Sequence, residues 1–213
     1  MNIGVLISGR GSNLRSLIEA KVGGQLSAEI ATVISNVQDA SGLEIAASHG
    51  IPIKVINHKE FDSRENFEGA LNKALILADI DLICLAGFMR ILSDTFVNNW
   101  RDRLINVHPS LLPSFKGLNT HERALEAGVC FTGCTIHFVR PAMDDGPIIL
   151  QAAIPTLPQD TPETLANRVL QQEHIIFPLA VRMIAEGRVK VEGNVVKIEG
   201  ASFHSAPIIN PFE

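Results

Sequence analysis

The sequence predicts an α/β fold: a Rossmann-like, mostly parallel twisted sheet with helices on both faces and an antiparallel C-terminal addition. Short, continuously apolar β-branched runs alternate with helical patterns over the first half of the chain, which is typical of a parallel sheet covered on both faces. Two later apolar runs follow each other with no room for a helix between them. The 213 residues, 46% hydrophobic and 19% charged, are enough for one substantial core, so we expect a single domain, 1–213.

The parallel, phosphate-binding half of the sheet is expected in residues 1–109. Its strands are predicted in the runs NIGVLIS, AEIATVIS, IPIKVI, DLICLAG and RLINVH. The helical patterns between them are NLRSLIEAKV, ASGLEIAASHG, SRENFEGALNKALILA and LSDTFVNNW. Because the strands are apolar throughout, we expect both faces of the sheet to be buried.

The antiparallel half is expected in residues 110–200. The runs CFTGCTIHFV and GPIILQAAIP predict two strands joined by RPAMDD. A long amphipathic helix follows, with Thr161 as N-cap, Pro162 at the first helical position and Gly187 at its end. The segment VKVEGNVVKIEG is typical of a small hairpin with a Gly-Asn turn, and residues 201–213 are expected to form a tail.

Composition and charge argue against several classes of function. The formal net charge is −5, and the sequence has no Lys/Arg cluster of the nucleic-acid-binding type, so neither a nucleic acid nor a membrane partner is expected. The first apolar run is too short for a signal sequence or a membrane span, and we expect a cytoplasmic protein. Cys84, Cys130 and Cys134 lie in apolar runs and are expected to be core residues, because C-x-x-x-C without a second pair is a poor zinc signature. No metal is expected.

A glycine-rich loop, SGRGSNL, lies between the first predicted strand and helix, where backbone N–H groups converge on a bound anion. Leu14 stands where a dinucleotide loop has its third glycine, and the Gly-Lys-Ser/Thr of a Walker loop is absent. The remaining turn, with Gly9, Gly11, Ser12 and Asn13, suits one phosphate group. The alternative is a plain strand-to-helix turn in which Ser12 or Asn13 caps the helix.

The strand that ends in INVHP places Asn106 and His108 on one face, about 6.6 Å apart, at the edge where open α/β sheets bind ligands. An amide and an imidazolium can both donate to an oxygen that becomes negative, as in acyl transfer. Ser110 lacks a nucleophile-elbow context, so we expect direct transfer to an amine or water. The alternative is a core histidine bonded to a backbone carbonyl, with Asn106 as a strand-end cap.

A carboxylate would complete this pair, because it can orient the imidazole ring and favour its protonated form. The loop RPAMDDGP between the two late strands offers Asp144 and Asp145. The same Asp-Asp-Gly-Pro is also ordinary turn chemistry. Sequence spacing alone does not bring either carboxylate to His108.

Together these motifs resemble the phosphoribosylglycinamide formyltransferase family of the formyltransferase superfamily. The resemblance covers nearly the whole chain, through LISGRGSNL, FDSRE, LAGFMRILS, INVHPSLLPSFKGLNTH, GCTIHFV, MDDGPII and QQEHIIFP in that order. It implies transfer of the formyl group from the co-substrate 10-formyltetrahydrofolate to the amine of phosphoribosylglycinamide, in purine biosynthesis. These two small molecules are the implied partners, and we expect a monomer or a weak homodimer.

The resemblance also implies roles for the residues at matching positions. Asn106, His108 and Asp144 would be catalytic, and Asp144 fits the family pattern hydrophobic-Asp-x-Gly-Pro better than Asp145. Phosphoribosylglycinamide would be bound by Gly11, Ser12, Asn13, Gln171, Gln172 and Glu173. The folate would be bound by Arg64, Met89, Arg90, Ile91, Leu92, Asn106, Arg140, Pro141, Ala142, Met143 and Asp144.

Two positions depart from the family pattern, and two histidines need a separate interpretation. Leu170 stands where relatives can carry a polar residue, and Thr135 replaces a common serine but keeps the hydroxyl. His121 and His137 lie in family-like motifs, and we interpret both as structural residues or as supports outside direct substrate contact.

Three other functions are alternatives. A methionyl-tRNA formyltransferase would share the three catalytic residues, but it should carry a further RNA-binding domain and a basic surface. A formyltetrahydrofolate hydrolase would normally carry an extra N-terminal domain. A non-catalytic phosphosugar-binding module would use the glycine loop but would have no need of Asn106, His108 and Asp144 together.

Overall fold

The computed structural model describes residues 1–203 and 205–211. Its centre is a seven-stranded sheet of order β3-β2-β1-β4-β5-β6-β7. The parallel strands are β1 (Asn2–Ile7), β2 (Glu29–Ser35), β3 (Ile53–Val55), β4 (Leu82–Leu85) and β5 (Leu104–His108). The antiparallel strands are β6 (Phe131–Phe138) and β7 (Ile148–Pro155). The predicted α/β fold with an antiparallel addition is confirmed.

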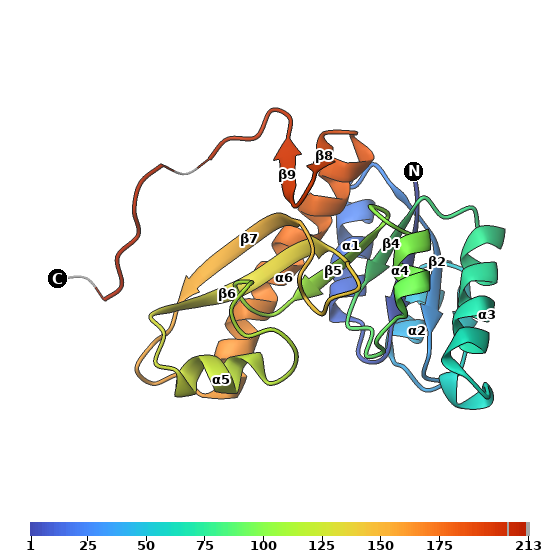
Figure 1. Cartoon of the computed structure of the whole chain (residues 1–213), viewed down its shortest axis with the longest axis horizontal. Helices are drawn as coiled ribbons and strands as arrows, with labels where there is room; N and C mark the ends of the chain where they lie inside the picture. Colours follow the sequence, from blue (N-terminus) through green and yellow to red (C-terminus); the bar gives the residue numbers. More distant parts are fainter. Residues whose placement is uncertain (204, 212–213) are drawn as a thin grey trace.

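Helices cover both faces of this sheet (Figure 1). One face carries α1 (Ser12–Val22), α2 (Gly42–Ser48) and α6 (Pro162–Ala185), with α5 (Thr120–Glu126) against α6. The other face carries α3 (Arg64–Leu77) and α4 (Asp94–Asn99). Each face therefore buries its own hydrophobic cluster, as a doubly covered parallel sheet requires.

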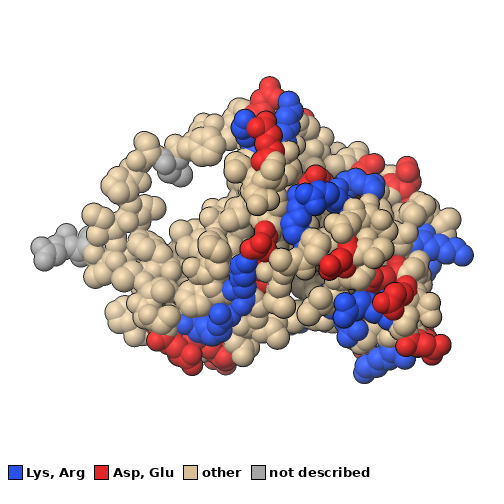
Figure 2. All heavy atoms as spheres, viewed as in Figure 1, with Lys and Arg blue, Asp and Glu red and all other residues tan. Residues whose placement is uncertain are grey.

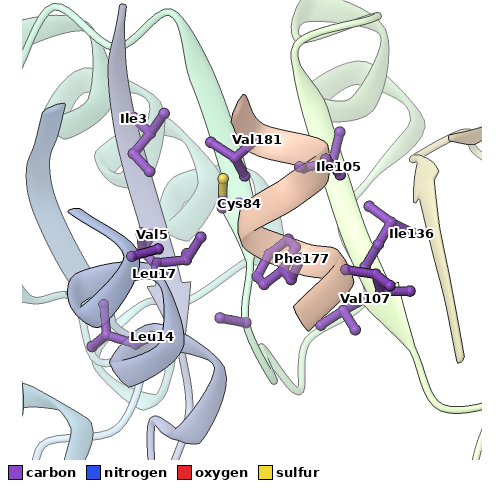
Figure 3. Close-up of a cluster of buried hydrophobic side chains, with 14 of the residues drawn as sticks. Ile3, Val5, Leu14, Leu17, Cys84, Ile105, Val107, Ile136, Phe177 and Val181 are labelled. Carbon is purple, nitrogen blue, oxygen red and sulfur yellow. The ribbon is translucent and has the colours of Figure 1, made fainter. Parts of the chain in front are cut away.

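The larger hydrophobic cluster is centred on α6. Phe177 and Val181 of this helix lie among Cys84, Ile105 and Val107 of β4 and β5 (Figure 3). The N-terminus of α6 has the predicted capping residues. The Thr161 side chain accepts the N–H of Thr164, and Pro162 is the first helical residue. Because Ile105 and Val107 of β5 pack against α6, the alternate side chains of β5 point to the opposite face of the sheet.

The edge strand β3 and one cysteine differ from the prediction. Ile53 and Val55 are 46% and 39% exposed, because β3 has a neighbour on one side only. An apolar run therefore does not establish burial at the edge of a sheet. Cys84 and Cys134 are buried as predicted, whereas Cys130 is exposed and the prediction of a core position was wrong there.

Two short elements were not predicted from the sequence. Helix α5 follows Asn119, which has a positive φ of 55°, and a 3-10 turn spans His58–Glu60. Both are too short to show a clear apolar period. The segment between β5 and β6, for which no helix or strand was predicted, therefore contains one helix.

The C-terminal residues form the predicted hairpin, β8 (Val189–Glu192) and β9 (Val195–Ile198), as a separate two-stranded sheet. Beyond it the chain extends away from the hairpin (Figure 1), and the Asn210 amide donates to the carbonyl oxygen of Cys130 at 2.7 Å. The expected tail, 201–213, includes positions 204, 212 and 213, which lie outside the described residues.

The charge distribution on the surface and the length of the helices bear on the expected partners. Acidic and basic side chains are interspersed over the face shown in Figure 2, without one continuous basic area. Within the described part of the chain, no helix is both long and apolar enough to cross a bilayer.

Candidate active site

The carboxyl end of β5 presents Asn106 and His108 on the sheet face opposite α6. Ile105 and Val107 point into the α6 cluster, so the alternation of a strand places Asn106 and His108 on the other side. Pairing with β6 sets Asn106 opposite His137 and His108 opposite Thr135. Residues directly opposite in an antiparallel pair share a face, so four polar side chains gather there.

Asp144 reaches this cluster from the loop between β6 and β7. Its Oδ2 lies 3.4 Å from His108 Nδ1 and accepts the backbone N–H of Gly117 at 2.8 Å. Asp145 instead pairs with Lys116, and its side chain is 58% exposed, against 13% for Asp144. The structure thus brings Asn106, His108 and Asp144 together, as what we call the Asn106 cluster, and leaves Asp145 at the surface.

The hydrogen bonds of His108 determine which ring nitrogen is free to act. Nε2 lies 3.0 Å from the carbonyl oxygen of Phe115. A carbonyl only accepts, so Nε2 carries a proton. Nδ1 therefore faces Asp144, at a distance longer than a tight charge-assisted bond of about 2.8 Å. The carbonyl contact expected of a structural histidine is present, but it occupies only one of the two nitrogens.

His137 borders the cluster on the β6 side. Its Nε2 lies 3.4 Å from Asn106 Nδ2 and 3.8 Å from Asp144 Oδ1. Burial lowers the pKa of His137, partly offset by its hydrogen bond to the Phe138 carbonyl and by the charge of Asp144. Polar Thr135 and His137 alternate with apolar neighbours in β6, a pattern in the sequence that could have placed both on the face of the site.

Thr135 holds the chain that follows His108. Its hydroxyl donates to the Ser110 carbonyl at 2.7 Å and accepts the backbone N–H of Leu112 at 3.1 Å. The Gln151 amide also donates to this hydroxyl, at 3.0 Å. The Thr135 hydroxyl therefore takes part in several hydrogen bonds, which a serine hydroxyl at the same position could also make.

The glycine loop after β1 is shaped by close approach to α2. Gly11 has a φ of 72°, and a Cβ built on it would lie 2.6 Å from the Cα of Gly42. Gly11 is also the N-cap of α1, and no side chain among the described residues caps this helix. The alternative in which Ser12 or Asn13 serves as the cap was therefore wrong. The first-turn N–H groups of α1 remain suited to an anion.

Asn13 and Glu173 join the glycine loop to α6. Asn13 Nδ2 donates to Glu173 Oε2 at 2.7 Å between two buried side chains. Burial raises the pKa of Glu173, and the Asn13 hydrogen bond opposes that rise. Asn13 Oδ1 is buried without a hydrogen-bond partner among the described residues. Gln171 is exposed and Gln172 is partly buried, so Glu173 is the residue of this group that meets the loop.

The segments predicted to bind folate are largely exposed. Met89 and Ile91 are 65% and 67% exposed, whereas Leu92 is buried in the α3 and α4 cluster. The Met89 N–H donates to Ser8 Oγ at 2.7 Å, which ties this loop to the end of β1. The other predicted residues with exposed side chains are Arg64, Arg90, Pro141, Ala142 and Met143.

Arg140 and Arg64 differ in how firmly they are held. Arg140 Nη2 donates to Asp102 Oδ1 at 2.5 Å, and its Nη1 donates to the Val139 carbonyl at 3.1 Å. Arg64 is the first residue of α3, and no hydrogen bond or ion pair among the described residues joins it to the Asn106 cluster. Among the described residues, Arg64 therefore makes no direct polar contact with Asn106, His108 or Asp144.

Sheet order brings these segments to one edge. β1, β4 and β5 are neighbours and parallel, so the glycine loop, the Met89 loop and the Asn106 cluster follow adjacent carboxyl ends. Exposed apolar side chains beside buried polar groups are typical of a ligand site. Two surface cavities, of about 460 Å³ near Trp100 and about 520 Å³ near His174, lie elsewhere. The described residues contain no cluster of metal-binding side chains.

A family model, curated relatives and solved structures all match this chain over most of its length. The family model described as formyl transferase matches residues 1–181. Phosphoribosylglycinamide formyltransferase of Escherichia coli (strain K12) is 44% identical over 94% of each chain. Trifunctional purine biosynthetic protein adenosine-3 of Homo sapiens is 51% identical over 90% of this chain, which spans about a fifth (19%) of that relative. Glycinamide ribonucleotide transformylase 1 from Symbiobacterium toebii superposes with a TM-score of 0.91 at 45% identity, over 93% of both chains.

Proposed function

The chain belongs to the formyl transferase family, and from this premise we propose that it transfers the formyl group of 10-formyltetrahydrofolate to the amine of phosphoribosylglycinamide, a step of purine biosynthesis. One observation carries the proposal. Asn106, His108 and Asp144 gather at the carboxyl edge of a sheet, beside a loop suited to a phosphate group.

In the proposed reaction, the substrate amine attacks the formyl carbon directly. A bond forms between the amine nitrogen and that carbon, and the bond from the carbon to the folate nitrogen breaks. The Asn106 amide and the Nδ1–H of His108 donate to the oxyanion of the tetrahedral intermediate. Nδ1 has this role because the Phe115 carbonyl occupies Nε2, whereas Asp144 Oδ2 lies 3.4 Å from Nδ1, too far for a tight hydrogen bond.

Asp144 orients the His108 ring and stabilises its cationic form. The Gly117 N–H holds the carboxylate in place. The proton released by the attacking nitrogen passes through water to the folate nitrogen that leaves. This route needs no covalent intermediate with the protein, in keeping with the absence of a nucleophile-elbow context around Ser110.

Binding of the two substrates is assigned to the segments around this centre. The phosphate is held at Gly11, Ser12 and Asn13 by first-turn N–H groups of α1, while Glu173, with Gln171 and Gln172, meets the glycinamide amine or the ribose hydroxyls. The folate lies against Met89, Arg90, Ile91 and Leu92, under the loop 140–144, and Arg64 approaches it from the side.

The partners and location follow the same proposal. The two substrates are the partners, with no metal, nucleic acid or membrane involved. The net charge of −5 and the interspersed charges of Figure 2 support a reaction without a nucleic-acid partner. A monomer or weak homodimer in the cytoplasm is proposed.

The test is an assay for the folate product with phosphoribosylglycinamide present and then omitted. Turnover only when the amine is present is expected for the transferase. Equal turnover in both cases would indicate a hydrolase, since the same oxyanion donors also serve an attacking water. The absence of turnover, with binding of the phosphosugar retained, would indicate a binding module.

A further inference from the structure

We propose that His137 is a positioning residue that fixes the orientation of the Asn106 carboxamide, so that its amino group serves as an oxyanion donor. This role rests on the proposed function and adds a residue that does not touch the substrate. It assigns a purpose to a buried histidine that the mechanism above leaves unused.

The β5–β6 register provides the placement. Asn106 and His137 are directly opposite each other in an antiparallel pair, where Cβ atoms lie about 5 Å apart. Asn106 Nδ2 lies 3.4 Å from His137 Nε2, a long hydrogen bond of the kind that can tighten when a substrate binds. His137 is 2% exposed, so its ring has little freedom to move away.

The other ring nitrogen fixes the tautomer of His137. Nδ1 lies 3.1 Å from the carbonyl oxygen of Phe138, and a carbonyl only accepts, so Nδ1 carries the proton. In the neutral ring Nε2 is then an acceptor, and its nearer polar neighbour is Asn106 Nδ2 at 3.4 Å, with Asp144 Oδ1 farther away at 3.8 Å. Burial lowers the pKa of His137, which favours this neutral form. The charged or titratable groups around the ring are Asp144, His108 and Lys116.

An acceptor at Nε2 selects one of the two orientations of the Asn106 amide. The amino group can donate to Nε2, whereas the amide oxygen in its place would meet a lone pair. The second N–H of Asn106 then has no other partner among the described residues and is available to the formyl oxygen. If the acceptor were lost, the amide could rotate and turn its oxygen toward the developing negative charge.

The experiment is a double-mutant cycle between His137→Leu and Asn106→Ala, with kcat and KM measured for both substrates. His137→Leu is expected to lower kcat at least about tenfold, which is less than the roughly hundredfold loss expected when an oxyanion donor is removed outright. KM should change by less than about twofold. In the Asn106→Ala background the same change should lower kcat less than about twofold. His137→Gln, which can still accept a hydrogen bond, should restore most of kcat.

Thr132→Val provides the matched control. Thr132 is also buried in β6, two per cent exposed, but strand alternation places it on the opposite face from His137, so kcat should not change. A structural role for His137 would lower the thermal midpoint and reduce kcat by the same factor in both backgrounds. That additive result would overturn the proposal, and so would an unchanged kcat in His137→Leu.

A measurement on the wild-type protein applies even if His137→Leu fails to fold. Long-range ¹H–¹⁵N spectra at neutral pH should show His137 as a neutral ring with its proton on Nδ1. A proton on Nε2 would overturn the proposal. Failure of the proposed function can be told apart from failure of the role of His137. If the proposed function is wrong, the wild-type protein lacks transferase turnover. If the wild-type protein turns over normally but the mutant cycle is additive, only the role of His137 is refuted.

Discussion

The glycine loop and the Asn106 cluster differ in how far apart along the chain their residues lie. Gly11, Ser12 and Asn13 are consecutive and share the first turn of one helix. Asn106 and His108 come from β5, whereas Asp144 comes from the loop after the next strand. The first arrangement needs one local turn, and the second needs two strands in the correct register.

This difference indicates which changes each region tolerates. The glycine loop depends on backbone shape, so a single methyl group can disrupt it. The Asn106 cluster depends on side-chain functional groups held by strand pairing, so changes of similar size but different chemistry should affect it most. Even the loop is completed by a long-range contact, because Glu173 meets Asn13 from 160 residues away.

The largest expected effect is the loss of a proposed catalytic group from the Asn106 cluster. His108→Ala should lower kcat at least about a hundredfold, since one oxyanion donor contributes about 3–4 kcal/mol. Asp144→Asn should also lower kcat strongly and alter its pH profile, while the exposed neighbour variant Asp145→Asn should leave kcat within about twofold. Near-normal kcat and an unchanged pH profile in Asp144→Asn would show that its assigned role is wrong.

A smaller effect is expected from a methyl group in the glycine loop. Gly11→Ala should reduce the free energy of unfolding by roughly 2–3 kcal/mol, from a left-handed φ and a clash with the Gly42 backbone. It should also weaken binding of the phosphosugar. Gly24→Ala is the matched control, because Gly24 has a φ of 69° but open space around its Cβ position. If urea denaturation showed the same loss in free energy of unfolding for both variants, close packing against Gly42 would not be the cause.

The pH dependence of stability tests the contact that joins the loop to α6. The folded-state pKa of Glu173 lies above its ordinary value of 4.5, so the stability contributed by this carboxyl is present below that value and is lost as the pH rises through the folded-state pKa. Glu173→Gln cannot ionise and should raise the thermal midpoint at pH 8 by roughly 2–4 °C, on the order of 1 kcal/mol, but not at pH 4. A gain that is the same at both pH values would exclude ionisation as its cause.

Another stability effect concerns the Thr135 hydroxyl, which supports the loop after β5. Thr135→Ser keeps the hydrogen bonds to Ser110 and Leu112 and should cost less than about 1 kcal/mol in the free energy of unfolding. Thr135→Val has the same shape without the hydroxyl and should cost about 1–3 kcal/mol. Both are measured by chemical denaturation, and a Val variant as stable as the Ser variant would show that shape alone matters at this position.

Much of the fold follows from local patterns in the sequence. The alternation of apolar runs and helical periods predicts the parallel strands and their crossover helices, and Thr161 and Pro162 predict the start of α6. The same local information places Asn106 and His108 on one strand face. These features are accessible because hydrophobic periodicity and capping depend on residues within a few positions of each other.

The tertiary structure decides the contacts between distant segments. It selects Asp144 over Asp145 as the neighbour of His108, pairs Asn13 with Glu173, and sets His137 opposite Asn106. The physical reason is that a strand's period of two residues determines the face of a side chain but not its partner. The partner depends on register and loop path, which are fixed only when the whole sheet and its covering helices pack together.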